Sequence, residues 1–175
     1  MFHEIIQHTI DGNHCIGCSP DNPHGMKIQS VWSGVMETRC SFEPQPHMAA
    51  ASPEVLNGGV IATLIDCHAV CTAVSYGRRL AGPDHADEIM YATGSMDIRY
   101  VRPTPIDRPV EVRARITGVS DRKVVLECTL SSDGQLRMTV RVARGRGYVQ
   151  GEENQTETVP AGSIFQIWPR LESET

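Results

Sequence analysis

A single carboxylate lies within a long apolar segment of the sequence. Asp66 is the only Asp, Glu, Lys or Arg between Gly58 and Tyr76, a stretch that reads GGVIATLIDCHAVCTAVSY. Burying an unpaired carboxylate costs several kcal/mol, so folding alone would favour an apolar side chain at this position. We therefore predict that Asp66 acts as a nucleophile or a general base. The structural alternative is a carboxylate that Thr63 satisfies or that faces a solvent gap.

The residues just before this segment are suited to binding developing negative charge. Asn57 is a good helix N-cap, because its side-chain oxygen can accept hydrogen bonds from the first turn. Gly58 and Gly59 leave the backbone open to close approach. Free N–H groups and the positive end of the helix dipole could polarise a substrate carbonyl there, as in an oxyanion hole. Gly58 and Gly59 are the predicted donors.

The spacing between these two features predicts an oligomer. Asp66 lies seven residues beyond Gly59, which is about 10 Å along a helix at about 1.5 Å per residue. A base and an oxyanion donor must both lie about 3 Å from one carbonyl group. One chain cannot meet both conditions. We therefore predict a homodimer or a dimer of dimers with shared sites, in which the glycines of one subunit face Asp66 of another.

The element that positions these residues is a predicted helix from Asn57 to about Tyr76. Gly77, followed by two arginines, is typical of a helix end. The helix is apolar on nearly all sides, so we expect it to be buried. His68 is two residues beyond Asp66 and points to nearly the opposite side. We therefore expect His68 to be a core or interface residue.

Six short runs read as strands, and the last three of them alternate with period two, as half-buried antiparallel strands do. The runs are residues 27–33, 35–42, 95–101, 110–117, 123–131 and 136–149. Asp133-Gly134 is a strong hairpin signal, and residues 80–92 read as a polar loop. An antiparallel sheet of about six strands can wrap around one long central helix. The predicted fold class is therefore α+β.

The 175-residue chain is expected to contain one domain, over residues 27–149, between a leader at 1–26 and a polar tail at 150–175. The short apolar run at 164–168 of the tail is expected to dock on the surface. The formal net charge is −5, but residues 99–146 hold eleven Arg and Lys against five acids. We place these cations on the outer face of the sheet, where they would suit an anionic ligand or would form solvated strand faces. Nucleic acid is disfavoured as a partner, because stacking aromatics are nearly absent there.

The cysteines and the N-terminus give weaker signals. The first residues have no apolar run typical of a signal peptide, so we expect a cytoplasmic protein with reduced thiols and, given the polar residues in its apolar segment, no membrane partner. Cys15 and Cys18 with His24 have a spacing known from zinc sites, but no second pair of that kind follows. No metal or cofactor is therefore predicted. Cys67 and Cys71 are expected to be small packing residues.

The segment LNGGVIATLIDCHAVCTA resembles the helix motif of hotdog-fold acyl-CoA thioesterases of the phenylacetate-pathway (PaaI-like) type. Those proteins commonly read HGG, followed by an acid nine residues after the His. Asn57 stands in the His position and Asp66 in the acid position. The likeness continues through MDIRYVRPTPI at 96–106, the Asp133-Gly134 hairpin and the leader HCIGCSPDNPHGM, and it covers residues 14–149.

This resemblance implies a hotdog fold, hydrolysis of acyl-CoA thioesters without a cofactor, and assembly as dimers or dimers of dimers. It also implies roles for the helix motif: nucleophile or general base for Asp66, carbonyl polarisation by Gly58 or Gly59, and thioester contact by Asn57. Thr93 corresponds to a hydroxyl that positions water in some relatives. Ala51 stands where other members have an Asn, so that role is vacant here.

Partners for the CoA phosphates are expected on the basic strands, with Arg102, Arg122 and Lys123 as the best candidates. Two other functions stay open. The Asn57 substitution is also consistent with an acyl-CoA-binding protein without turnover. A hydroxyacyl thioester dehydratase would need a His facing an acid, and His47 is the only candidate before the helix. Release of free CoA, binding alone, or formation of an enoyl thioester would distinguish the three.

Overall fold

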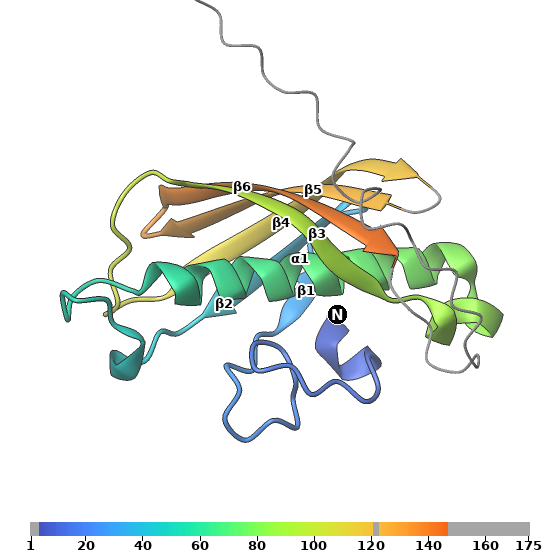
Figure 1. Ribbon diagram of the computed structural model, residues 1–175, viewed down its shortest axis with the longest axis horizontal. Helices are drawn as coiled ribbons and strands as arrows, with labels where there is room; N and C mark the ends of the chain where they lie inside the picture. Colours follow the sequence, from blue (N-terminus) through green and yellow to red (C-terminus); the bar gives the residue numbers. More distant parts are fainter. Residues whose placement is uncertain (1–3, 121–122, 147–175) are drawn as a thin grey trace, which may run out of the picture.

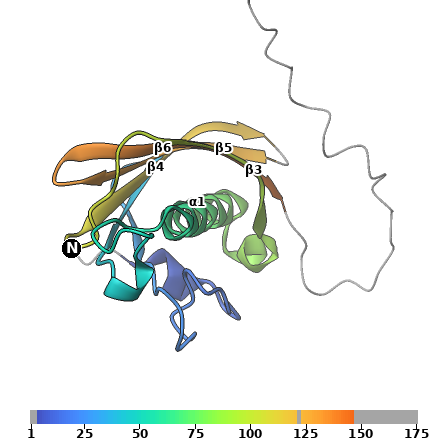
Figure 2. The same ribbon diagram turned by 60° about the vertical axis from the view of Figure 1, so that its left-hand side comes forward.

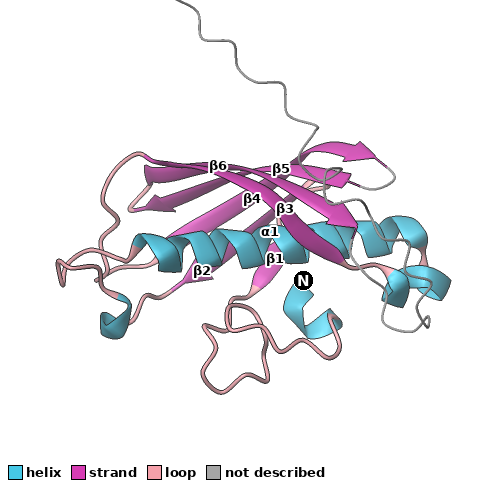
Figure 3. Ribbon diagram, in the orientation of Figure 1, coloured by secondary structure: helices cyan, strands magenta, loops and turns pink. Residues whose placement is uncertain are grey.

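The fold consists of one long helix held against a curved antiparallel sheet, as a computed structural model of residues 4–120 and 123–146 shows (Figure 1). The helix, α1, spans Gly58–Ala81. The six strands are β1 (Ser30–Trp32), β2 (Glu37–Phe42), β3 (Tyr91–Tyr100), β4 (Val110–Ser120), β5 (Lys123–Ser132) and β6 (Gln135–Arg146). The view coloured by secondary structure shows how the strands cross over the helix (Figure 3). The predicted α+β class and the sheet wrapped around one helix are confirmed.

The sheet order is β1-β2-β4-β5-β6-β3, and every neighbouring pair is antiparallel. After β2 the chain runs through α1 and then forms β3 at the opposite edge, next to β6. Within the described parts of the chain, β3 pairs only with β6. One long edge of β3 is therefore open beside the helix.

The core lies between α1 and the concave face of the sheet. Alternate residues of β4, β5 and β6 point to the helix and are at most 4% exposed: Val110, Val112, Ala114, Ile116, Val124, Leu126, Cys128, Leu130, Met138, Val140 and Val142. Leu64 and Ile65 of α1 meet this face and are fully buried. Burial of one such aliphatic side chain contributes about 1.5–3 kcal/mol.

The segment before β1 covers the side of α1 that faces away from the sheet (Figure 2). It contains the short 3-10 helix η1 (Ile6–Thr9). Ile6 and Ile28 are each only 2% exposed and belong to the core. The length and mean hydropathy of α1 would allow it to cross a membrane, but more than half of that stretch is buried inside the protein, as a core helix requires.

The predicted end of the helix at Tyr76 is wrong, because α1 continues to Ala81 and is capped by Gly82 at φ +79°. Gly77 lies inside the helix and is buried. A Cβ atom there would lie 2.8 Å from both Ile89 and Tyr91. Gly77 is thus required by the close approach of the following segment and does not end the helix.

The predicted loop at 80–92 is more ordered than expected. It contains the 3-10 helix η3 (Pro83–Glu88), and β3 begins at Tyr91, earlier than the expected residue 95. A further 3-10 helix, η2 (Pro46–Met48), lies in the connection before α1. The predicted tail at 150–175, with its apolar run, lies outside the described residues.

Candidate active site

Asp66 is held by two residues from the β3 edge of the sheet. Thr93 Oγ1 donates to Asp66 Oδ1 at 2.6 Å, and Arg144 Nη1 donates to the same oxygen at 2.8 Å. Arg144 Nη2 also donates to the Asp66 carbonyl at 2.8 Å. Thr93 and Arg144 are opposite each other in the register of β3 and β6. The alternative partner Thr63 instead donates to the Gly59 carbonyl at 3.0 Å.

The placement of Arg144 corrects the expectation that all the cations of residues 99–146 lie on the outer face of the sheet. Arg144 is fully buried and faces α1. Burial lowers its pKa, while the carboxylate of Asp66 acts in the opposite direction. The sequence did contain a signal for this position. Met138, Val140 and Val142 point inward, and the alternation of a strand places residue 144 on the same face.

Only one oxygen of the Asp66 carboxylate is fixed. Oδ1 accepts from Thr93 and Arg144, whereas Oδ2 has no hydrogen-bond partner among residues 4–120 and 123–146. The side chain is 39% exposed. The arrangement thus holds the carboxylate in one orientation and leaves its second oxygen accessible. Such an oxygen can take a proton from water or attack a carbonyl carbon.

The start of α1 supplies the second feature predicted from the sequence. Asn57 Oδ1 accepts from the N–H groups of Gly59 at 2.8 Å and Val60 at 3.4 Å, as expected of an N-cap. The Gly59 amide is therefore engaged. Within the described residues, the Gly58 N–H has no acceptor. Of the two predicted oxyanion donors, Gly58 is the one left free.

Tyr100, at the end of β3, packs directly over Gly58. Its hydroxyl donates to the Gly58 carbonyl at 2.8 Å. A Cβ at position 58 would lie 3.2–3.4 Å from the Tyr100 side chain, so a glycine accommodates this contact. The sequence gave no signal for this contact, because a helix start and a strand end meet only in the folded chain.

The two halves of the predicted site do not meet within one chain. Helix α1 is continuous from Gly58 to Ala81. Gly58 and Asp66 are thus separated by about 12 Å at about 1.5 Å per residue. The structure brings Thr93 to Asp66 and Asn57 to Gly59, as two separate groups.

The predicted CoA-binding residues also lie apart from one another. Lys123 pairs with Gly145 and lines a shallow cleft of about 270 Å³ on the outer face of the sheet. Arg102 follows β3 at the other end, where its N–H donates to the Arg137 carbonyl at 3.2 Å. The two ends are about 30 Å apart at about 3.3 Å per strand residue. Arg122 lies outside the described residues.

His68 is a core histidine, as the sequence predicted, and it is fully buried. Thr72 donates to the His68 carbonyl at 2.7 Å and lies 2.6 Å from Thr38, so Thr38 donates to Thr72. Thr38 must then accept from His68 Nε2 at 3.1 Å, which leaves Nδ1 as the acceptor for Ser30 at 2.7 Å. Burial lowers the pKa of His68 to about 4, so the ring is neutral near pH 7.

Two clefts flank the helix. One of about 950 Å³ lies beside its start and is lined by Asn57, Gly59 and Thr63 together with His47 and loop residues such as Met26. Asp66 does not line this cleft, so the structure does not place His47 against the acid that a dehydratase would need. Ala51 is exposed before the helix.

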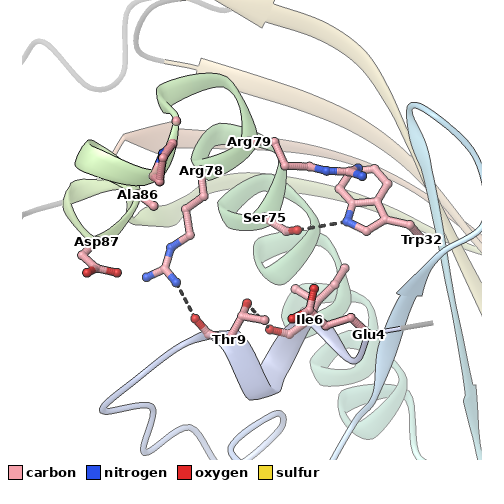
Figure 4. A pocket seen from close by; sticks show the side chains of 11 residues that line it. Glu4, Ile6, Thr9, Trp32, Ser75, Arg78, Arg79, Ala86 and Asp87 are labelled. Carbon is pink, nitrogen blue, oxygen red and sulfur yellow. Dashed lines mark hydrogen bonds between the residues drawn. The ribbon is translucent and has the colours of Figure 1, made fainter. Parts of the chain in front are cut away.

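The second cleft, of about 480 Å³, lies at the other end of α1 (Figure 4). There the Arg79 guanidinium lies 4.5 Å from the centre of the Trp32 ring, and Trp32 Nε1 donates to Ser75 at 3.0 Å. None of the site residues predicted from the sequence lines this cleft. The candidate active site is therefore the Asp66 group and the start of α1.

Comparison with known proteins points to a family. The family model described as "Thioesterase superfamily" matches residues 54–139, from just before α1 into β6. Over these residues the chain resembles the thioesterase superfamily. The match includes Asn57, Gly58, Asp66 and Thr93. Among curated proteins, no sequence matches significantly.

Several solved structures have the same fold. A thioesterase superfamily protein from Shewanella loihica PV-4 is 29% identical, with a TM-score of 0.60 over 78% of this chain and 96% of that one. The PaaI protein of the E. coli phenylacetic acid degradation operon is 12% identical, with a TM-score of 0.59 over 71% and 83%. A Streptococcus mutans UA159 protein, described as bound to acetyl CoA, is 13% identical, with a TM-score of 0.58 over 71% and 91%. The resemblance to PaaI-like hotdog proteins is confirmed.

Proposed function

We propose that this protein hydrolyses an acyl-CoA thioester to free CoA and a carboxylic acid. The observation that carries the proposal is the way in which the two carboxylate oxygens of Asp66 are bonded. One carboxylate oxygen is fixed by Thr93 and Arg144, and the other is free of hydrogen bonds within the described residues. A carboxylate that is oriented by a buried cation and keeps one oxygen accessible is suited to act as a base or a nucleophile.

The chemistry needs few groups, because a thioester is already activated. As a general base, Asp66 takes a proton from a water molecule that attacks the carbonyl carbon. As a nucleophile, it attacks that carbon itself and forms an anhydride that water then hydrolyses. On either route the C–S bond breaks and CoA leaves as a thiolate that takes up a proton. The Gly58 amide would stabilise the oxyanion, and no cofactor is required.

We further propose that each site is shared by two subunits of a homodimer, on its own or within a dimer of dimers. Asp66 and Gly58 lie about 12 Å apart on one helix, too far to act on one carbonyl. Asp66 lies beside β3, whose outer edge is open in the described chain. A long open strand edge is a ready surface for pairing with another chain. Antiparallel pairing there would bring the partner's Gly58 toward Asp66.

The proposed dimer would also bring together cations that lie far apart in one chain. Lys123 lies at the end of the sheet near Thr93, and Arg102 lies at the end near Tyr100. In an antiparallel dimer the first end of one subunit would meet the second end of its partner. We propose that Lys123, the neighbouring Arg122 and the partner's Arg102 bind CoA phosphates. The acetyl-CoA-bound S. mutans structure supports such a ligand for this fold.

A panel of acyl-CoA esters tests the function. The full chain is incubated with each ester while free thiol and products are followed. We expect release of free CoA together with the carboxylic acid, and release at least about 100-fold slower with Asp66→Asn. Saturable binding without thiol release would overturn the proposal in favour of a binding protein. An enoyl thioester formed from a hydroxyacyl-CoA would overturn it in favour of a dehydratase.

A further inference from the structure

Three of the six cysteines meet on the side of α1 that faces away from the sheet, and a fourth lies one helical turn further along. Cys15 and Cys18 come from the segment before β1, and Cys67 and Cys71 are one turn apart on the helix. The sulfur atoms of Cys15, Cys18 and Cys67 all lie within 4.8 Å of one another. Cys15 Sγ is 3.5 Å from Cys67 Sγ. Cys71 is buried and follows Cys67 by four residues, so it lies on the same face of α1.

The loop that carries Cys15 and Cys18 directs hydrogen-bond donors at their sulfur atoms. The Gly17 N–H donates to Cys15 Sγ at 3.3 Å, and Asn13 Nδ2 donates to Cys18 Sγ at 3.5 Å. Asn13 Oδ1 in turn accepts from the Cys15 N–H at 3.0 Å and shapes the turn. Such outer hydrogen bonds to a ligand atom are typical of the surroundings of metal sites.

Gly17 shows how tightly this loop fits the helix. A Cβ atom at position 17 would lie 2.2 Å from Cys67 Sγ, so no side chain can be present there. The Gly17 carbonyl also accepts from the Ile28 N–H at 3.1 Å, and the Ile16 carbonyl accepts from the Met26 N–H at 2.7 Å. The loop is thus pinned with its backbone against the sulfur of Cys67.

We propose that Cys15, Cys18, Cys67 and Cys71 bind one Zn²⁺ ion. Zinc in structural sites is tetrahedral with Zn–S bonds of about 2.3 Å, which places neighbouring sulfurs about 3.8 Å apart. The observed 3.5 Å between Cys15 and Cys67, and the 4.8 Å limit for three of the sulfurs, are close to this geometry. The site joins a C-x2-C pair in a loop to a C-x3-C pair on a helix. The sequence contains no second C-x2-C pair, and the C-x3-C pair on the helix would take its place.

The ion would have a structural role next to the candidate active site. Cys67 directly follows Asp66, and the loop that carries Cys15 continues into one wall of the 950 Å³ cleft beside the helix start, through Ile16 and Met26. Zinc would therefore fasten this wall to the middle of α1. The proposal does not depend on hydrolysis and is tested separately from it.

Metal content tests the site directly. The full chain is produced in zinc-supplemented medium, purified under reducing conditions and analysed for metal. We expect about one zinc per chain. Single substitutions Cys15→Ser, Cys18→Ser and Cys67→Ser should lower zinc affinity by more than about 100-fold, since even outer contacts are worth about 10–100-fold. Cys40→Ser and Cys128→Ser remove buried thiols elsewhere in the core and should retain zinc.

A second measurement does not depend on the variants being folded. Zinc is removed from the wild-type chain with a chelator under reducing conditions, and Co²⁺ is added. We expect the intense visible bands of a tetrahedral cobalt thiolate centre and protection of four thiols from a thiol reagent. Metal-free protein that stays unresponsive to Zn²⁺ and Co²⁺, a Cys15–Cys67 disulfide, or full zinc content in Cys67→Ser would each overturn the proposal.

Discussion

Arg144, fully buried on β6, donates a hydrogen bond of 2.8 Å to the partly exposed carboxylate of Asp66 on α1. The two ends of this pair are not equivalent. The carboxylate is partly exposed, so water can solvate it if Arg144 is removed. The guanidinium is buried, so water cannot take the place of Asp66 if that side chain is removed. Asp66 therefore has two roles: it pairs with a buried cation and it presents a free oxygen. A substitution at Asp66 must be chosen so that its effect on stability can be separated from its effect on activity.

Asp66→Asn is expected to remove turnover while keeping the fold. The amide oxygen can still accept from Thr93 and Arg144, but the side chain can neither take a proton nor attack as an anion. We expect kcat for CoA release to fall by about 10²–10⁴-fold. Thermal unfolding of the same sample controls for structure. A folded Asp66→Asn protein with wild-type kcat would contradict the role of Asp66.

Removal of either member of the Asp66–Arg144 pair should have unequal effects on stability. Asp66→Ala leaves a buried unpaired guanidinium, whereas Arg144→Met leaves a carboxylate that can be hydrated. Loss of one partner of a fully buried pair lowers the free energy of unfolding by about 3–5 kcal/mol. Because Asp66 is partly exposed, we expect Asp66→Ala to lower it by about 1–3 kcal/mol.

Urea unfolding of both single variants and the double variant measures this coupling. Asp66→Ala/Arg144→Met should be more stable than Asp66→Ala, because the second change removes the unpaired charge. Additive losses in the double variant would show that the two side chains do not stabilise each other.

Mixing two inactive variants tests whether the site is shared. Asp66→Ala removes the acid, and Gly58→Ala places a methyl group 3.2–3.4 Å from the Tyr100 side chain at the helix start. Random association of the two chains into dimers makes half of the dimers mixed, each with one intact site of two. Co-expression should therefore restore about a quarter of wild-type activity.

The control for this experiment is the same pair of proteins mixed after folding without subunit exchange, which should stay inactive. A co-expressed mixture no more active than its parents, although it contains mixed dimers, would place the whole site within one chain.

The buried histidine predicts a loss of stability in acid. Burial lowers the pKa of His68 to about 4 in the folded chain, compared with 6.5 for an unperturbed histidine, the value expected in the unfolded chain. Between these values the unfolded chain binds a proton that the folded chain does not, so stability falls as pH decreases from 6.5 toward 4. The total loss in the free energy of unfolding over this pH range is about 3 kcal/mol, at about 1.4 kcal/mol per pKa unit.

Denaturant unfolding from pH 7.5 to pH 4.5 measures this dependence. His68→Gln should be less stable at neutral pH, because it disturbs the Ser30 and Thr38 contacts, but its stability should vary less with pH. His85→Gln, a change at an exposed residue, should retain the wild-type slope. Equal slopes for wild type and His68→Gln would contradict the assignment.

Local signals in the sequence predicted much of this fold. The start of α1 was predicted correctly because Asn57 caps its own following residues. The positions of β4, β5 and β6 followed from the alternation along each of these strands. The end of α1 was missed because Gly77 serves a contact with Ile89 and Tyr91 in the next segment, and no property of the helix sequence distinguishes that use of a glycine from a stop signal.

The candidate site was predicted in part, for a similar reason. Asp66 was identified because an acid in an apolar helix is anomalous on its own. Its partner Arg144 is 78 residues away and was grouped with the exposed cations, because buried arginines are rare. The phase of β6 pointed inward, but only the folded chain shows which acid faces it.

Three successive residues of α1 connect the helix to three different parts of the protein. Asp66 contacts β3 and β6, Cys67 contacts the loop at Cys15, and His68 contacts β1 and β2. One inserted or deleted residue upstream in the helix would rotate all three by about 100° and exchange their neighbours. A length change in α1 upstream of Asp66 would therefore displace the candidate active site, the cysteine group and the buried histidine together.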